Sequence, residues 1–364
     1  MDSGELAISA AAAGAIVAAA VCAALAPLAV AIGRRWKILD APGGRKHHRD
    51  HIPRTGGIAV AGGFVVGCGV ALALGAFSPA ADLPFGALPF VAATAIVFAT
   101  GLVDDARGCP VGIKLLMQSA ASLVLVASGH AVDVVSTPLG VVELGPVAGS
   151  VATVVWLVGI TNAINLLDGL DGLAGGVAAI IAGSLAVFAL LVGDFASIAV
   201  ALALCGACLG FLPWNWRPAR VFLGDSGSQT VGFVLAWLSL TASLKATTAV
   251  AVLVPILAVG VPAIDTLIVM YSRFVESQSR PFLYRVYRIV QADRLHLHHH
   301  VLTVTGYRNA VLVVYGAVLL GCLLALVTAV RNEPDLAAFT VLVEIGAVMI
   351  LRHLSPRASR LKQP

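Results

Sequence analysis

Four polar side chains recur at intervals of three in the stretch ITNAINLLDGLDGLAGG: Asn162, Asn165, Asp168 and Asp171. Carboxylates and amides are costly to place within an apolar chain, so such residues are functional candidates by default. A polar kink whose carboxamides are satisfied locally is the alternative. Three steps of three residues turn the set by about half a turn around an ideal helix. We therefore expect either a helix that tightens or unwinds at Gly169, or two different partners for the polar groups.

Three more aspartates stand where apolar runs meet polar loops. Asp104 and Asp105 repel each other unless a cation or a proton neutralises them, so the pair predicts a metal site or a general base, with a topological stop signal as the alternative. Lys114 follows on the next apolar segment, one turn before Gln118. Asp225 lies in GDSGS, where small residues before a helix would let a phosphate approach free backbone N–H groups. An aspartate there suits Mg2+ that is bound to that phosphate, and a simple N-cap turn is the alternative.

Two loops are rich in Arg and His. The first reads RRWKILDAPGGRKHHRDHIPRTGG and has an anion-binding composition, although topology alone explains part of its charge; it contains Arg45, Lys46 and His48. The second ends in DRLHLHHH and contributes His296, His298 and His299. These histidines could chelate zinc, but no HExxH motif is present and the carboxylates elsewhere favour a hard cation. We interpret both loops as phosphate-binding surfaces.

The composition requires membrane helices to position these groups. Of the 364 residues, 59% are hydrophobic and only 12% are charged, whereas soluble chains are about a quarter charged. A span needs roughly 20 mostly apolar residues, whose backbone polar groups must be satisfied within the helix. The sequence predicts an all-α polytopic membrane protein, a single domain over residues 1–364. Its eleven predicted spans lie near 6–33, 56–77, 86–103, 112–128, 151–166, 173–192, 196–212, 229–244, 248–271, 310–329 and 336–351. Asp265, in the ninth span, is either a structural paired residue or a catalytic one.

Charge placement predicts the orientation of these spans. If the first span runs from outside to inside, only Lys245 and Arg331 of the 23 Lys and Arg residues fall outside, which is the positive-inside pattern. The N-terminus is then extracytoplasmic, and the cytoplasmic side holds loops near 34–55, 104–112, 166–172, 213–228 and 272–309 and a basic tail at 352–364. The net charge of +4 belongs to these loops and does not indicate nucleic-acid binding. A long extracytoplasmic stretch predicts a short β-hairpin around Pro138–Gly140.

All candidate motifs therefore fall on the cytoplasmic face. Carboxylates for Mg2+, small-residue turns and Arg or His donors are the parts that phosphoryl transfer requires, because its catalysis consists mainly of positioning and charge neutralisation. A membrane location implies that one substrate is a lipid. The residues by themselves thus favour phosphoryl transfer with a lipid substrate.

Five motifs, in their order along the chain, resemble those of the polyprenyl-phosphate N-acetylhexosamine-1-phosphate transferase family, which includes WecA, TagO and MraY. They are DAPGGRKHHRDHIPRTGG, GLVDDARG with Lys114 and Gln118, NAINLLDGLDGLAGG, VFLGDSGSQTVGF and DRLHLHH. The histidine motif, preceded by RP and DR, is closer to the WecA-like group than to the HHHFE pattern of MraY. The resemblance covers most of the chain.

The resemblance implies that N-acetylhexosamine 1-phosphate, most simply GlcNAc 1-phosphate, moves from a UDP-sugar to undecaprenyl or another polyprenyl phosphate in a bacterial cytoplasmic membrane, with release of UMP. It also implies Mg2+ as cofactor, for which Mn2+ could substitute. By motif, Asp104, Asp105 and Asp225 would be catalytic, and the metal ligands would be Asp105, Asp168 and Asp225. The substrates and metal would be surrounded by Arg45, Lys46, His48, Lys114, Asn162, Asn165, Asp168, Asp171, His296, His298 and His299.

Several alternatives remain open at the level of sequence. UDP-MurNAc-pentapeptide is the alternative donor, and its transfer would serve peptidoglycan synthesis. Transfer could occur in one step, by direct attack of the lipid phosphate, or in two steps with Asp104 or Asp105 as a covalent nucleophile. A homodimer is a further expectation. A secondary transporter would place polar residues and broken helices near mid-membrane, whereas the motifs here gather at one face.

Overall fold

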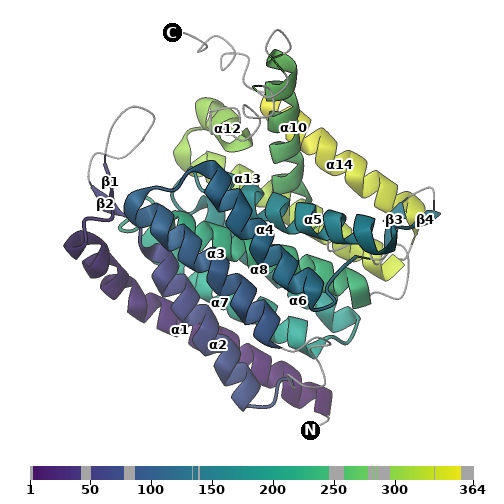
Figure 1. The fold of residues 1–364 in the computed structure, drawn as a ribbon, viewed down its shortest axis with the longest axis horizontal. Helices are drawn as coiled ribbons and strands as arrows, with labels where there is room; N and C mark the ends of the chain where they lie inside the picture. The colour runs from purple at the N-terminus through teal and green to yellow at the C-terminus, as the bar shows by residue number, and fades with distance from the viewer. Residues whose placement is uncertain are drawn as a thin grey trace.

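Helices build most of the described chain (Figure 1), as the sequence predicts. The computed structural model describes residues 3–41, 51–77, 87–132, 134–137, 140–245, 258–277, 281, 284, 296–331 and 333–353. The helices are α1 (Ser3–Arg35), α2 (Gly56–Ala73), α3 (Ala87–Arg107), α4 (Val111–Ala127), α5 (Gly145–Leu167), α6 (Leu173–Leu191), α7 (Phe195–Asn215), α8 (Gly224–Lys245), α10 (Gly260–Glu276), α12 (Leu297–Thr305), α13 (Tyr307–Arg331) and α14 (Pro334–His353). The prediction of an all-α protein is confirmed.

Eight of the described helices are long and apolar enough to cross a membrane, namely α1, α2, α3, α5, α6, α7, α13 and α14. A ninth, α4, is apolar but has only 17 residues. The stretch that leads into α10 is described only from residue 258 onward. The chain is therefore a multi-pass membrane protein, and the count of eleven spans stays a prediction.

Two small antiparallel sheets accompany the helices. β3 (Val134–Thr137) pairs with β4 (Gly140–Glu143), so that the first residue of one strand faces the last residue of the other. This pairing confirms the predicted hairpin. β1 (Leu39–Asp40) pairs with β2 (Ile52–Pro53) in the first polar loop, a contact that the sequence did not suggest.

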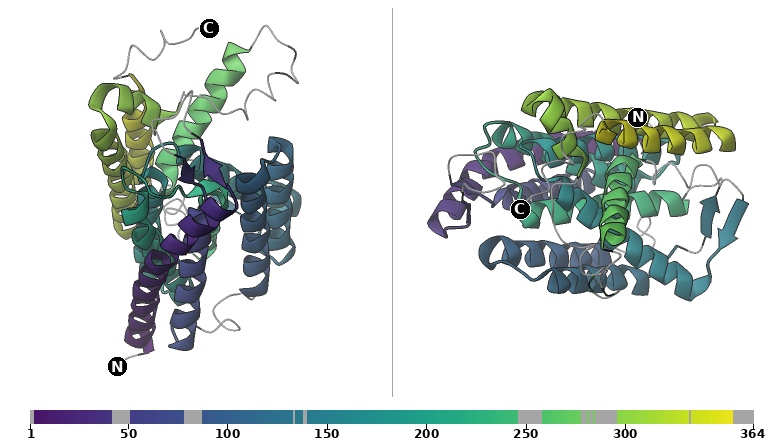
Figure 2. Two further views of the ribbon diagram at one scale, coloured as in Figure 1. Left: turned by 90° about the vertical axis from the view of Figure 1, so that its left-hand side faces the viewer. Right: turned by 90° about the horizontal axis from the view of Figure 1, so that it is seen from above.

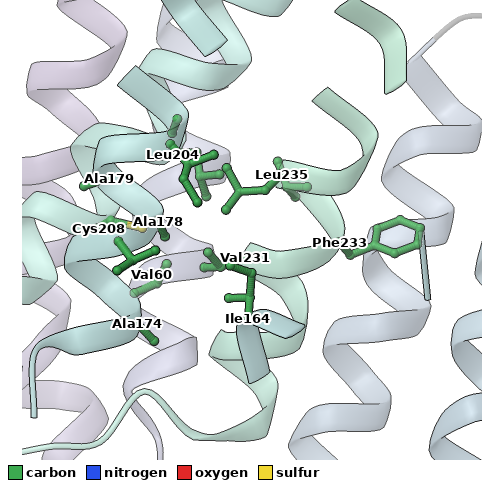
Figure 3. Close-up of a cluster of buried hydrophobic side chains, with 14 of the residues drawn as sticks. Val60, Ile164, Ala174, Ala178, Ala179, Leu204, Cys208, Val231, Phe233 and Leu235 are labelled. Carbon is green, nitrogen blue, oxygen red and sulfur yellow. The ribbon is translucent and has the colours of Figure 1, made fainter. Parts of the chain in front are cut away.

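The central helix of the bundle is α8. It packs against α2, α3, α5, α6 and α7, and its residues 226–242 are all buried. Figure 3 shows Val231 and Leu235 beside Ile164 of α5 and Leu204 of α7, while Phe233 points to the opposite side of α8. A helix whose side chains are buried on every side lies in the middle of its bundle. Its first turn therefore lies at the centre of one end of the bundle.

Small residues let α1, α2 and α7 approach one another closely. A Cβ on Gly206 or Gly210 of α7 would collide with the backbone of α1 at Ala15 or Ala19, and a Cβ on Gly14 would collide with the backbone of α2. Such contacts are usual between membrane helices, because burial of apolar surface gives little extra driving force in lipid. These helices form a tightly packed layer on one side of α8.

The C-terminal helices lie on the opposite side of the bundle from α3 and α4. Seen from above in Figure 2, α13 and α14 line one edge, α3 and α4 line the other, and α10 stands between them. One end of α10 extends beyond the neighbouring helices in Figures 1 and 2. The short helix α12 packs against α13 and α14. This arrangement brings α12 to the end of the bundle at which α8 begins.

Candidate active site

The predicted site residues that the structure describes gather at one end of the bundle. Asp104 and Asp105 lie in the last turn of α3, Lys114 lies in the first turn of α4, and Asn165 lies in the last turn of α5. Asp225 opens α8. Residues far apart in sequence thus meet at helix ends, where backbone groups without helical partners add further donors and acceptors.

Asp105 is buried and holds the N-terminus of α8. Its Oδ1 accepts a hydrogen bond from the backbone N–H of Asp225 (2.8 Å), and its Oδ2 accepts from the N–H (2.9 Å) and the hydroxyl (2.7 Å) of Ser226. The first N–H groups of a helix lack partners within it, and a carboxylate there also interacts favourably with the helix dipole. Asp105 therefore makes a positioning contact with both oxygens, whereas the sequence predicted a metal ligand or a general base at this position.

The glycines around GDSGS serve close packing. A Cβ on Gly57 would collide with the backbone of Gly227, and a Cβ on Gly101 would collide with the backbone of Ser226. The N–H groups of Asp225 and Ser226 are those that the Asp105 carboxylate already binds. The prediction that this turn offers free N–H groups to a phosphate is therefore wrong for these residues. The N-cap alternative describes the turn, with the capping side chain supplied by α3.

Lys114 bridges two carboxylates. Its Nζ lies 3.0 Å from Oδ2 of Asp104 and 2.9 Å from Oδ2 of Asp225. The other oxygen of Asp104 accepts a hydrogen bond from the backbone N–H of Cys109. All three charged side chains are largely shielded, with 20% of Lys114, 11% of Asp104 and 15% of Asp225 exposed. Ion pairs in such surroundings are stronger than surface pairs.

Asp225 is held by polar groups from three helices. Its Oδ1 lies 3.3 Å from Nδ2 of Asn165 on α5, and its Oδ2 accepts hydrogen bonds from Gln229 on α8 (3.0 Å) and Lys114 on α4. Burial opposes ionisation of this carboxyl, but the positive charges of Lys114 and Arg54 hold its pKa well below the usual range. Asp225 is therefore a carboxylate at neutral pH and can attract a second cation.

A chain of amides extends from Asp225 into the bundle. Oε1 of Gln229 accepts a hydrogen bond from Gln118 (3.0 Å), whose own Oε1 accepts one from Asn162 (2.7 Å). Polar networks in a low-dielectric interior stabilise a structure only when their members are satisfied, and this one links α8, α4 and α5. Gln118 belongs to the aspartate-pair motif, whereas Gln229 was not among the site residues predicted from the sequence. The signal was available, because Gln229 lies one helical turn after Asp225.

Helix α5 ends at Leu167 in a tight turn, which is close to one of the alternatives that the spacing predicted. The N–H of Asp168 donates to the carbonyl of Asn165 (3.2 Å), and the N–H of Gly169 donates to that of Leu167 (2.8 Å). Gly172 then adopts a φ of +82° before α6 begins, a left-handed conformation that favours glycine. We call residues 168–172 the signature turn. It divides the evenly spaced polar groups between different partners.

The two aspartates of the signature turn have different surroundings. Oδ2 of Asp171 accepts a hydrogen bond from the backbone N–H of Ala219 (3.2 Å), and the N–H of Asp171 donates to the hydroxyl of Tyr307. Asp171 thus ties the turn to the loop before α8 and to α13. Within the described part of the chain, the carboxylate of Asp168 accepts no hydrogen bond, and it lies within electrostatic range of Asp225. Asp168 is the carboxylate that remains open.

Asp168 and Asp225 form the candidate metal-binding pair. Burial, followed by the negative charges of Asp225 and Asp105, raises the pKa of Asp168 to about 7. A divalent cation beside such a group would reverse this effect. Among the described residues, no group of three or more His, Cys, Asp or Glu side chains is arranged to hold a metal ion. One or two carboxylates completed by water and substrate phosphates are nevertheless the usual ligands of Mg2+, so the pair fits a cation shared with a phosphate-bearing substrate.

Arg54 is a site residue that was not among those predicted from the sequence. Its Nη2 lies 3.7 Å from Oδ1 of Asp105 and 3.6 Å from Oδ1 of Asp225, and 33% of its side chain is exposed. The N–H groups of Gly56 and Gly57 donate to carbonyls in the loop before α8, which fixes the backbone beside Arg54. The available signal was the PRTGG sequence of the first basic loop. Its other candidates, Arg45, Lys46 and His48, lie outside the described residues.

His298 is buried in the first turn of α12 and packs on the signature turn. Its Nε2 is so close to Gly169 that a Cβ there would collide with the ring. Neither ring nitrogen has a hydrogen-bond partner in the described structure. Burial, together with the charges of the neighbouring histidines, keeps the pKa of His298 well below its usual value, so the ring is neutral. Buried polar atoms without partners are rare in proteins, and here they indicate a place for a ligand.

The two other predicted histidines flank His298. The ring of His299 packs 4.2 Å from that of His298. His296 directs its Nδ1 to Asp265 on α10, at 3.0 Å, and its Nε2 is buried without a partner in the described structure. The sequence left the role of Asp265 open, and the structure shows it to be a paired residue. The structure thus brings the histidine motif to the signature turn.

Comparison with known proteins is consistent with the motifs. A family model described as "Glycosyl transferase family 4" matches residues 87–243, from α3 into α8. The chain is similar to a probable undecaprenyl-phosphate N-acetylglucosaminyl 1-phosphate transferase of Bacillus subtilis, with 32% identity over 80% of this chain and 77% of the relative. It is also similar to a decaprenyl-phosphate N-acetylglucosaminephosphotransferase of Mycolicibacterium smegmatis, with 33% identity over 77% and 73%. The undecaprenyl-phosphate alpha-N-acetylglucosaminyl 1-phosphate transferase of Escherichia coli K12 is 27% identical over 79% and 76%.

Proposed function

This chain belongs to glycosyl transferase family 4, and we propose that it transfers GlcNAc 1-phosphate from UDP-GlcNAc to a polyprenyl phosphate. The observation that carries this proposal is the pair Asp168 and Asp225, beside Lys114, at one end of a membrane-helix bundle. The names of the relatives specify N-acetylglucosamine and undecaprenyl or decaprenyl phosphate, which favours this donor over UDP-MurNAc-pentapeptide.

In the proposed reaction, an oxygen of the lipid phosphate attacks the β-phosphorus of UDP-GlcNAc. A new P–O bond forms there, and the bond from that phosphorus to the oxygen bridging the two phosphates breaks. The electron pair leaves with UMP, and the lipid carries a diphosphate-linked GlcNAc. The reaction brings several negative charges together, so the site must supply cations in fixed positions.

Lys114 and Asp104 are suited to the acceptor phosphate. Lys114 is held between Asp104 and Asp225 and can place one positive charge beside an incoming phosphate without moving. Asp104 is partly exposed, and the Oδ2 that pairs with Lys114 is suited to remove a proton from a monoprotonated acceptor phosphate. Asp105 has both oxygens bound to α8, so we assign it to holding the Asp225 backbone. In this arrangement the lipid phosphate attacks the donor directly, and no covalent intermediate forms on an aspartate.

Asp168 and Asp225 would hold Mg2+, and Mn2+ could take its place. When bound, the cation neutralises charge on the donor diphosphate and so helps UMP to leave. Asn165 keeps Asp225 in orientation through a contact of 3.3 Å. Gln229, at the end of the amide chain, donates a hydrogen bond to Oδ2 of Asp225, which also pairs with Lys114.

Arg54 and the histidines are suited to bind the donor. Arg54 has guanidinium donors that can pair with phosphate oxygens. The unpartnered ring nitrogens of His296 and His298 offer neutral hydrogen-bonding groups next to the signature turn. Asp171 fixes that turn to the loop before α8 through Ala219. Together these contacts would orient the donor diphosphate relative to the acceptor.

The proposed orientation places this end of the bundle in the cytoplasm, with the N-terminus outside and the C-terminus inside. The supporting observation is that only Lys245 and Arg331, of 23 Lys and Arg residues, would then lie outside. A bacterial cytoplasmic membrane follows from the organisms of the relatives. A homodimer stays a prediction.

The decisive experiment supplies purified protein in detergent with polyprenyl phosphate, Mg2+ and UDP-GlcNAc, and measures UMP together with the lipid-linked product. Parallel reactions contain UDP-GalNAc or UDP-MurNAc-pentapeptide. We expect one UMP per lipid-diphosphate sugar with UDP-GlcNAc, and none when acceptor or divalent cation is omitted. Product formed only from the pentapeptide donor would refute the assigned donor. No UMP from any donor would refute the transferase.

A further inference from the structure

Asp265 joins three separate elements at the edge of the site. It lies on α10 and is 3% exposed. Its Oδ1 accepts hydrogen bonds from the backbone N–H of Leu297 (3.0 Å) and from Nη1 of Arg352 on α14 (2.8 Å). Its Oδ2 pairs with Nδ1 of His296 (3.0 Å). A carboxylate oxygen accepts hydrogen bonds, so Nδ1 of His296 is the donor in this contact.

This carboxylate supplies the N-terminal cap that α12 lacks. His296 is the N-cap residue, but its side chain makes no capping hydrogen bond, and Leu297 is the first helical residue. The backbone N–H of Leu297 is satisfied instead by Asp265, from another helix. A buried negative charge at a helix N-terminus both pairs with the unsatisfied N–H and interacts favourably with the helix dipole. The start of α12 is thus located by α10.

The cap also determines where the imidazoles lie. With Nδ1 of His296 bound to Asp265, its Nε2 is turned to a buried position without a partner. His298 lies two residues further along, and its Nε2 faces Gly169 in the signature turn. A shift or rotation of α12 would therefore move the His298 ring away from that turn and break the contact of His296 with Asp265.

Arg352 extends this connection to the C-terminal helix. It lies in the last turn of α14, and its side chain is only 11% exposed. Removal of Arg352 would leave a buried carboxylate without its main charge partner, and such a group is strongly disfavoured. The end of α14 therefore supplies a direct partner to the carboxylate that caps α12.

We propose that Asp265 and Arg352 are positioning residues that hold α12, so that His296 and His298 are presented to the donor at the signature turn. This inference rests on the proposed function and deepens it, because it assigns residues of α10 and α14 to donor recognition. Neither residue touches the reacting atoms. Their loss should weaken donor binding while leaving the acceptor side, which is built by α3, α4 and α8, unchanged.

The test compares Asp265→Asn, Arg352→Gln and Arg352→Lys with the wild type. We expect Asp265→Asn and Arg352→Gln to raise the KM for UDP-GlcNAc by about tenfold, the size typical when the partner of a functional histidine is lost. The KM for polyprenyl phosphate should stay within about twofold, which separates donor positioning from a general structural defect. Arg352→Lys, which retains the charge, should recover most of the donor affinity.

Hydrogen exchange of the segment 296–306 provides a readout that does not need activity. Asp265→Asn and Arg352→Gln should speed exchange in α12 and leave α8 protected. The matched control is Arg331→Gln, an exposed arginine in the last turn of α13, at the far end of the helix from α12. It should alter neither exchange nor either KM. If Asp265→Asn does not fold, Arg352→Gln carries both measurements.

The outcomes separate this inference from the proposed function. An active wild type, with unchanged donor KM and unchanged exchange in Arg352→Gln, would overturn the positioning role alone. An equal rise in both KM values would overturn it as well. A wild type that releases no UMP would refute the transferase. Even then, faster hydrogen exchange of α12 in Arg352→Gln but not in Arg331→Gln would still support the role of Arg352 in holding α12.

Discussion

The capping contact of Asp105 leads to a prediction that separates positioning from metal binding. Asp105→Asn keeps the shape of the side chain but replaces one acceptor oxygen by an NH2 group that faces N–H donors of α8. One hydrogen bond to a charged group, worth about 1.5–3 kcal/mol, is lost. The interaction of the buried charge with the helix N-terminus, worth up to about 2 kcal/mol, is lost as well. Because these contributions overlap, we expect a destabilisation of about 3 kcal/mol.

The assay combines thermal unfolding in detergent with the Mg2+ dependence of UMP release. A loss of about 3 kcal/mol should lower the unfolding midpoint by roughly 4 °C in a protein of 364 residues. Below that midpoint, the Mg2+ concentration for half-maximal activity should stay within about twofold of the wild type, because no metal ligand has been removed. Asp225→Asn is the comparison. It removes a proposed ligand, so its half-maximal Mg2+ concentration should rise, and high Mg2+ should restore only part of the activity.

The opposite pattern would refute this argument. If Asp105→Asn melts like the wild type but needs much more Mg2+, then Asp105 is a metal ligand and its contacts with α8 are secondary. A normal Mg2+ requirement in Asp225→Asn would remove Asp225 from the metal site. Both measurements use the same preparations, so a change in folded fraction cannot be mistaken for a change in metal affinity.

Three further predictions test other parts of the site. The pKa of Asp168 is raised to about 7 by burial and nearby carboxylates, so protons compete with Mg2+ for this carboxylate. When Mg2+ binding is titrated at different pH values, the affinity should rise by about tenfold per pH unit up to pH 7 and level off above it. An affinity that does not depend on pH would contradict this. Gly169→Ala should raise the KM for the donor, because the new Cβ would collide with the imidazole of His298. Gly159→Ala has open space around its Cβ and should leave that KM unchanged. Equal kinetics for the two variants would contradict the packing of His298 on Gly169. Arg54→Gln should weaken the binding of UDP-GlcNAc. Arg107→Gln, which changes an exposed arginine at the end of α3, should not. Equal losses of affinity in the two variants would show that donor binding depends on overall positive charge and not on Arg54 itself.

The architecture was largely predictable from sequence, because the bilayer restricts what an apolar chain can do. Satisfaction of backbone groups inside lipid requires helices, and the described helices follow the apolar stretches. The hairpin of β3 and β4 was also predictable from its turn residues and alternation. The pairing of β1 with β2 was not, since two-residue strands carry no periodic pattern.

The candidate site was predictable as a set of residues and not as a set of roles. Asp104 and Asp105 look equivalent in sequence, as do Asp168 and Asp171. The structure separates each pair: Asp105 caps α8 while Asp104 pairs with Lys114. Such roles depend on which helix end lies opposite, and that information is absent from local sequence. Arg54 was overlooked for the same reason, because its partners are contributed by α3 and α8.

The sequence by itself determined that acidic, amide and histidine groups would meet at one end of a membrane bundle, because charge and hydropathy decide which loops share a side. Tertiary structure alone decided how the evenly spaced groups of the signature turn divide. The end of α5 rotates them apart, so that Asn165 contacts Asp225, Asp171 holds the loop before α8, and Asp168 remains open. Spacing along a chain specifies directions only while the helix continues. Once the helix ends, the neighbouring helices determine what each side chain meets.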